Sequence, residues 1–116
     1  MGRVRRRPPR PLPGARLSRF SDIIERQLRF FQEDYADLIA RCDAAERAYD
    51  RAGRDEAEER YGDFVDAVAA GAEILAEIRD GYARTLRDGI RETYEQAFAR
   101  AVAKRLPRFA LELESH

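Results

Sequence analysis

The chain has only one histidine, His116, among its 116 residues. A di-metal site in a helical bundle is usually built from Glu-x-x-His pairs, and a serine or cysteine nucleophile usually needs a neighbouring base such as histidine. The seven glycines occur singly rather than in a phosphate-binding loop. We therefore expect a non-enzymatic protein with no catalytic, cofactor-binding or metal-binding residues.

Cysteine and long apolar runs are also scarce. Cys42 is the only cysteine, so no intrachain disulfide can form. It falls on an apolar helical stripe and is expected to be a small core residue, with an exposed or intersubunit thiol as the alternative. The sequence contains no run of about 18 apolar residues and no secretory signal, so we expect a cytoplasmic protein with no membrane partner.

Acidic residues are absent from the first 19 positions, which hold seven arginines and four of the five prolines. The other residues carry 15 basic and 22 acidic side chains, so a neutral chain combines a basic segment with an acidic remainder. We expect residues 1–17 to form a disordered Arg/Pro-rich arm. The arm could contact nucleic-acid phosphates, dock on an acidic protein surface or stay solvated without a partner. The candidate anion contacts are Arg3, Arg5, Arg6, Arg7 and Arg10.

Apolar side chains recur every three or four residues over most of the remaining chain. This spacing predicts one helix over about residues 18–52 and a second over about 55–105. Gly53 is expected to end the first helix in a left-handed conformation, and Asp55 with Glu58 to cap the second. A connection this short makes the helices antiparallel neighbours, so the fold class is all-α, a helical hairpin within residues 18–106. The positions expected to hold it together are Ile24, Leu28, Phe31, Tyr35, Leu38, Phe64, Val68, Leu75 and Ile78.

The apolar spacing changes after Tyr82 to regular steps of four. The change coincides with two Arg-Asp-Gly segments that contain Gly81 and Gly89, and Asp-Gly pairs favour turns. The second helix could therefore continue to residue 105, or break near Gly81 or Gly89 to give a third helix. We favour the continuous helix, because the two glycines are only eight positions apart and leave little room for a loop.

A continuous second helix would extend beyond the first by residues 88–106, about 27 Å. Its apolar side chains would then be exposed, and exposed apolar patches usually mark interaction sites. A dimer of hairpins forming a four-helix bundle would cover them, and a folded-back third helix would cover some of them within one chain. The C-terminal tail, residues 107–116, is expected to dock as a strand or an added helical turn. The predicted oligomer interface consists of Ile90, Tyr94, Phe98, Val102 and Leu106.

The sequence as a whole favours a helical interaction or assembly subunit that oligomerises through apolar helix faces. Its expected partner is a second copy, with a dimer favoured, or a larger protein assembly. Two alternatives stay open. One is a nucleic-acid-associated protein that binds phosphates through the arginine-rich arm, and the other is a helical-bundle carrier of a metal or ligand.

Overall fold

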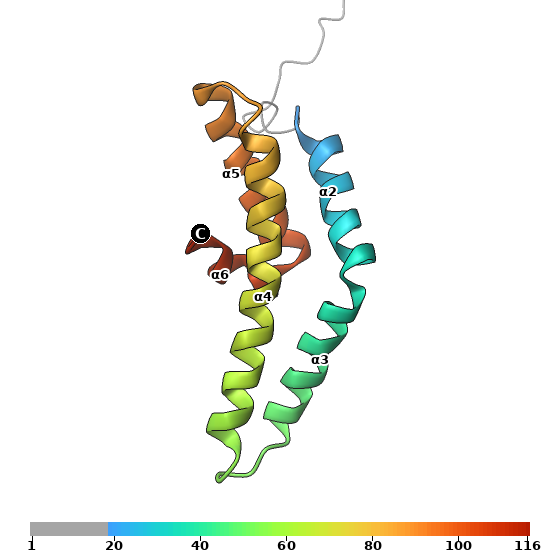
Figure 1. The fold of residues 1–116 in the computed structure, drawn as a ribbon, viewed down its shortest axis with the longest axis vertical. Helices are drawn as coiled ribbons and strands as arrows, with labels where there is room; N and C mark the ends of the chain where they lie inside the picture. Colours follow the sequence, from blue (N-terminus) through green and yellow to red (C-terminus); the bar gives the residue numbers. More distant parts are fainter. Residues whose placement is uncertain (1–18) are drawn as a thin grey trace, which may run out of the picture.

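The computed structural model describes residues 19–116, and this part of the chain is helical without strands (Figure 1), as the sequence predicts. The arm predicted for residues 1–17 lies outside the described residues. The elements are α2 (Ser21–Asp34), α3 (Ala36–Asp50), α4 (Ala57–Ala83), α5 (Asp88–Arg105), the 3-10 turn η1 (Pro107–Phe109) and α6 (Ala110–Glu114).

The helix predicted over residues 18–52 is two helices that meet at a bend. Tyr35 separates α2 from α3 with φ −116° and ψ 31°, outside the helical range. Backbone hydrogen bonds still join Tyr35 N–H to the Phe31 carbonyl and Ile39 N–H to the Tyr35 carbonyl, at 2.9 and 3.1 Å. The bend lets α2 pack against α5 while α3 packs against α4.

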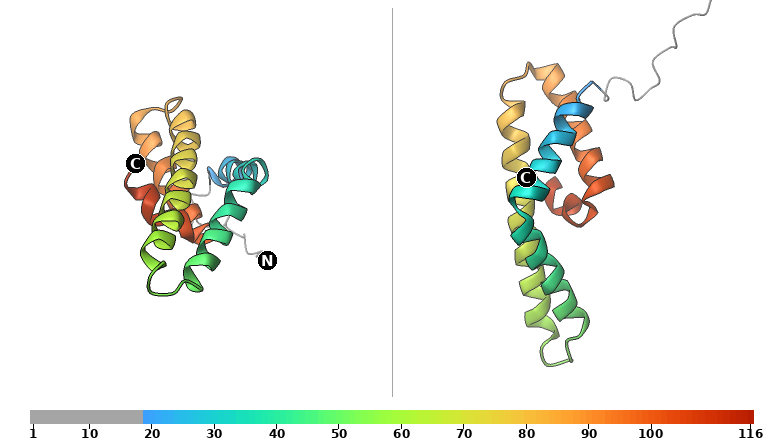
Figure 2. Two further views of the ribbon diagram at one scale, coloured as in Figure 1. Left: turned by 60° about the horizontal axis from the view of Figure 1, so that its bottom comes forward. Right: turned by 90° about the vertical axis from the view of Figure 1, so that its right-hand side faces the viewer.

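The antiparallel pair of α3 and α4 extends beyond the other helices as a two-helix projection (Figure 2), which we call the hairpin end (residues 47–61). Its turn differs from the prediction. α4 begins at Ala57 without a side-chain cap, and Glu56 N–H donates to the Gly53 carbonyl at 3.0 Å. Gly53 does not adopt a positive φ, so the predicted left-handed end of the first helix and the Asp55 cap are both wrong.

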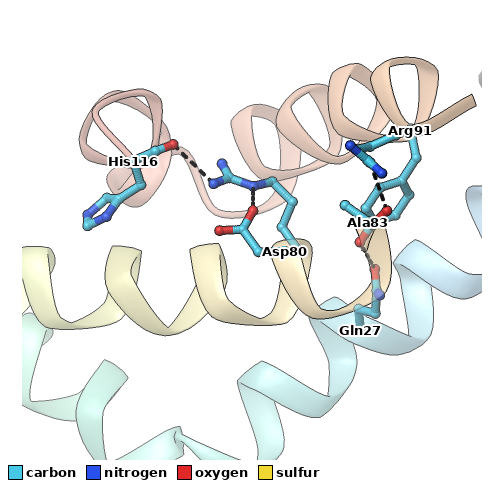
Figure 3. A network of polar contacts seen from close by, with 7 residues as sticks. Gln27, Asp80, Ala83, Arg91 and His116 are labelled. Atoms are coloured by element: carbon cyan, nitrogen blue, oxygen red, sulfur yellow. Dashed lines mark hydrogen bonds and ion pairs between the residues drawn. The ribbon is translucent and has the colours of Figure 1, made fainter. Parts of the chain in front are cut away.

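The prediction of a continuous helix over residues 55–105 is wrong. α4 ends at Ala83 and α5 begins at Asp88, so the chain reverses at residues 84–87, between the two glycines considered in the sequence. Arg91 stabilises this reversal, because its Nε donates to the Ala83 carbonyl at 3.1 Å (Figure 3). Its Nη2 also donates to the Leu86 carbonyl at 3.0 Å. The Ala83 carbonyl also accepts a hydrogen bond from the Leu86 N–H at 3.0 Å, so Arg91 adds side-chain bonds to a turn that the backbone already closes.

The reversal brings the apolar stripe of α5 onto α2 and α4. Tyr94, Phe98 and Val102 are fully buried, Leu106 is buried and Ile90 is half-buried. The prediction that these five side chains are exposed and form an oligomer interface is therefore wrong for this stripe. Burying them within the chain recovers about 1.5–3 kcal/mol for each large apolar side chain, which a continuous helix would forgo.

The C-terminal tail packs against the middle of α4, as the docking prediction requires, and it does so as helical turns rather than a strand (Figure 1). Pro107 opens η1, and the side chains of Phe109 and Leu113 are buried. The Phe109 ring packs edge-on against Phe31 with centroids 5.6 Å apart. The tail therefore contributes Phe109 and Leu113 to the core.

Candidate interaction face

The hairpin end has only two helices, so its apolar side chains are partly uncovered. The rings of Tyr49 on α3 and Tyr61 on α4 pack together with centroids 5.3 Å apart, and both side chains are exposed. Both tyrosines follow the three- and four-residue spacing of apolar side chains that predicts the helices. The periodicity identified the correct face of each helix. It could not show that α3 and α4 are the only helices in this part of the molecule.

A hollow beside Tyr61 extends the exposed apolar surface onto α6. Tyr61, Phe64 and Val65 of α4 line it together with Leu111 of α6, and it encloses about 190 Å³. Together with Tyr49 we call these residues the apolar face. The described residues contain five exposed large apolar side chains, and four of them belong to this face: Tyr49 (39 % exposed), Tyr61 (51 %), Val65 (36 %) and Leu111 (78 %).

A second hollow of about 450 Å³ adjoins the first across Phe64. Its apolar walls come from Ile39 of α3, Leu106 and Pro107 after α5, and Phe109 of η1. Arg108 lines both hollows. The two hollows therefore share Phe64 and Arg108, and the second is also lined by Arg105 and Glu46.

Arg108 is held by two carboxylates of α3. Its Nη1 lies 2.8 Å from Asp43 Oδ1, and its Nη2 donates to Glu46 Oε1 at 2.6 Å. Burial acts to lower the pKa of the Arg108 guanidinium, but the hydrogen bonds to Asp43 and Glu46 outweigh it, so the pKa is raised above its ordinary value. Arg108 thus stays charged and ties η1 to α3.

Cys42 lies on the inner side of α3 and is fully buried, as predicted for a small core residue. Burial raises the pKa of its thiol, chiefly through desolvation. A buried, protonated thiol is a poor nucleophile, and this position does not offer an accessible intersubunit thiol.

Other polar contacts tie the helices of the body together (Figure 3). The Tyr94 hydroxyl of α5 donates to Gln27 Oε1 of α2 at 2.9 Å. Arg79 of α4 donates to Asp80 Oδ1 at 2.8 Å and to the backbone oxygen of His116 at 3.0 Å. The bonds to Gln27 and His116 join elements far apart in the sequence, and the Gln27 bond satisfies the hydroxyl of the buried Tyr94.

The apolar face offers a partner apolar surface to bury, beside the paired guanidinium of Arg108. Within residues 19–116, no three His, Cys, Asp or Glu side chains are grouped so that they could share a metal ion. No helix of this part of the chain is long and apolar enough to cross a membrane. The candidate anion contacts Arg3, Arg5, Arg6, Arg7 and Arg10 lie outside the described residues.

Comparisons of the chain with protein families, with curated proteins and with solved structures gave no match.

Proposed function

We propose that this chain is a non-catalytic assembly protein that self-associates through the apolar face of Tyr49, Tyr61, Phe64, Val65 and Leu111. The observation that carries the proposal is the gathering of four of the five exposed large apolar side chains of residues 19–116 on one surface. Scattered exposed apolar residues need no explanation, whereas a contiguous patch with polar surroundings is typical of an interaction site.

A second copy is the simplest partner for this surface. The hairpin end supplies two antiparallel helices, and two such ends packed face to face would make the four-helix arrangement that antiparallel helix pairs commonly adopt. A two-fold dimer uses the same surface on both subunits, so one face is sufficient. The rings of Tyr49 and Tyr61 already pack together and would lose little conformational freedom on association.

Light scattering of the purified full chain at micromolar concentration tests the proposal. The wild-type chain is expected to have the mass of a dimer, and Val65→Glu is expected to have the mass of a monomer with unchanged helicity. Phe30→Glu is the matched control, because Phe30 is also an exposed apolar residue but lies on α2, outside the apolar face. A monomeric wild-type chain, or equal dissociation by both variants, would contradict the proposal.

A further inference from the structure

A second groove lies on the other half of the molecule, between α2 and α5. Its floor is apolar and consists of Ile24, Leu28 and Ala97, which are themselves buried, and of the half-buried Ala101. The groove encloses about 400 Å³. It shares none of its lining residues with the apolar face, although Arg105 also lines the hollow beyond Phe64.

One wall of this groove is strongly basic. Arg100, Lys104 and Arg105 of α5 line it, and no carboxylate of residues 19–116 lies within ion-pair distance of any of the three. Arg105 donates only to the neutral Gln32 Oε1, at 3.2 Å. The one acidic residue in the lining, Glu25, already pairs with Arg29 one turn along α2 at 3.3 Å.

The positive wall contrasts with the rest of the chain. Residues 20–116 carry 15 basic and 22 acidic side chains, yet residues 96–111 contain no acidic residue at all. The start of α2 contributes Ser21, Ile24 and Glu25 to one end of the groove. The basic wall therefore stands out within residues 20–116, whose charge is otherwise acidic.

We infer that the groove between α2 and α5 binds an acidic, amphipathic helical segment of a partner protein. Apolar side chains one turn apart on that segment would rest on Ala101 and on the exposed edges of Ile24 and Ala97, which is how helices occupy grooves in other proteins. Carboxylates beside them would face Arg100 and Lys104. The α5 wall from Ala97 to Arg105 is about 12 Å long at 1.5 Å per residue, enough for two turns of a docked helix.

An acidic peptide fits this groove better than nucleic acid does. Phosphate binding needs cations but has no use for an apolar floor, and the acidic remainder of the chain would repel a nucleic-acid backbone. The peptide uses both features, because its apolar side chains cover the floor and its carboxylates pair with the wall. Opposite charge across the groove also sets the orientation of the bound segment.

The test is fluorescence anisotropy with the full chain and a labelled synthetic peptide that forms an amphipathic helix of leucine on one face and glutamate on the other. We expect saturable binding that weakens as salt is raised. A peptide of the same composition, scrambled so that leucines do not share a face, should bind at least about tenfold more weakly, because it cannot place anchors on the floor. Absence of saturable binding at millimolar peptide, or equal binding of the scrambled peptide, overturns the inference.

Variants then locate the bound peptide. Lys104→Glu and Ala101→Phe should each weaken binding about tenfold or more, by charge repulsion and by filling the groove respectively. Arg47→Glu on α3 and Ala103→Phe on the outer side of α5 are the matched controls and should bind within about twofold of the wild type. If the control variants lose as much affinity as the groove variants, the peptide does not bind in the groove between α2 and α5 and the inference is wrong.

Two further measurements keep the test independent of variant folding. Peptide added to the unmodified chain should shift the amide resonances of Ala97, Ala101 and Lys104 and leave those of Tyr61 and Leu111 unchanged. A labelled single-stranded oligonucleotide should not produce the same shifts. If the oligonucleotide shifts these amides and the peptide does not, the groove is a phosphate site and the inference is wrong.

Discussion

The ring of Phe109 occupies the space that a side chain at Gly71 would need. Gly71 lies in the buried middle of α4, and a Cβ built at this position would collide with the Phe109 ring. This close approach lets η1 lie directly on α4 and places Arg108 opposite the carboxylates of α3. Because Gly71 has no side chain, the tail can pack directly on α4, where it completes the core and the apolar face.

Gly71→Ala is therefore expected to destabilise the chain, although alanine is the better helix former. Displacing the Phe109 ring should lower the free energy of unfolding by about 1–3 kcal/mol. Gly62→Ala, in the same helix with no atom within 4 Å of the added Cβ, should raise it by up to about 1 kcal/mol. Urea denaturation of both variants checks that the two substitutions change the free energy of unfolding in opposite directions. Stabilisation by Gly71→Ala would mean that Phe109 does not dock there.

Phe98→Asp should unfold the chain rather than dissociate an oligomer. Phe98 is fully buried among residues of the core, and an unpaired carboxylate there should cost more than about 4 kcal/mol. Ala99→Asp, at the exposed neighbouring position of α5, should change stability by less than about 1 kcal/mol. Circular dichroism separates the two variants. A well-folded Phe98→Asp chain would show that α5 does not pack back on α2 and α4.

The sequence predicts the helical class because helix periodicity is a local property. Six of the nine positions expected to hold the hairpin are buried, and Tyr35, Phe64 and Ile78 are half-buried. The reversal at residues 84–87 was not predictable in the same way. These residues include neither glycine nor proline, and the chain turns there because burying the α5 stripe outweighs a few lost backbone hydrogen bonds.

The candidate sites were even less accessible to sequence reasoning. Arg108 meets Glu46 across 62 positions of sequence, and no local pattern connects the two. The apolar face depends on which part of α4 a third helix covers, and this follows from the position of the reversal. Periodicity found the apolar side chains of Tyr61 and Phe64, but it could not tell which of them the chain itself would bury.

Arg108→Met should loosen the tail without unfolding the body. The substitution keeps the aliphatic stem but removes two charged hydrogen bonds, and we expect a loss of about 1–2 kcal/mol. Hydrogen exchange should rise in η1 and α6 more than in α2. Arg60→Met is the control, since Arg60 makes only longer, exposed ion pairs with Glu56 and Asp63 and should cost less than about 0.5 kcal/mol. Equal losses for both arginines would contradict the role assigned to Arg108.

Alkaline pH should destabilise the chain through Tyr94. Burial raises the pKa of its phenol in the folded state above the ordinary value of 10.0. Above pH 10.0 the unfolded chain therefore binds fewer protons than the folded chain, so the free energy of unfolding falls as pH rises. Tyr94→Phe should make this dependence shallower while costing about 1 kcal/mol at neutral pH, because Gln27 loses its donor.

Cys42 also makes the free energy of unfolding fall as pH rises, and its effect begins at a lower pH than that of Tyr94. Its pKa is raised from 9.0 by burial, so Cys42→Ala should remove a part of the slope that begins near pH 9.0. Urea denaturation between neutral and alkaline pH checks both variants. A Tyr94→Phe chain with the wild-type slope would show that the phenol is not buried in the folded state.

Solvent-paramagnetic NMR on methyl-labelled full chain tests the account most directly, because it reports internal burial and self-association together. The methyl groups of Val102 are expected to be protected at every protein concentration. Those of Val65 and Leu111 are expected to be exposed in dilute solution and to gain protection as the concentration rises. Val102 methyl groups that become exposed on dilution, or Val65 and Leu111 methyl groups that stay exposed at every concentration, would contradict the account.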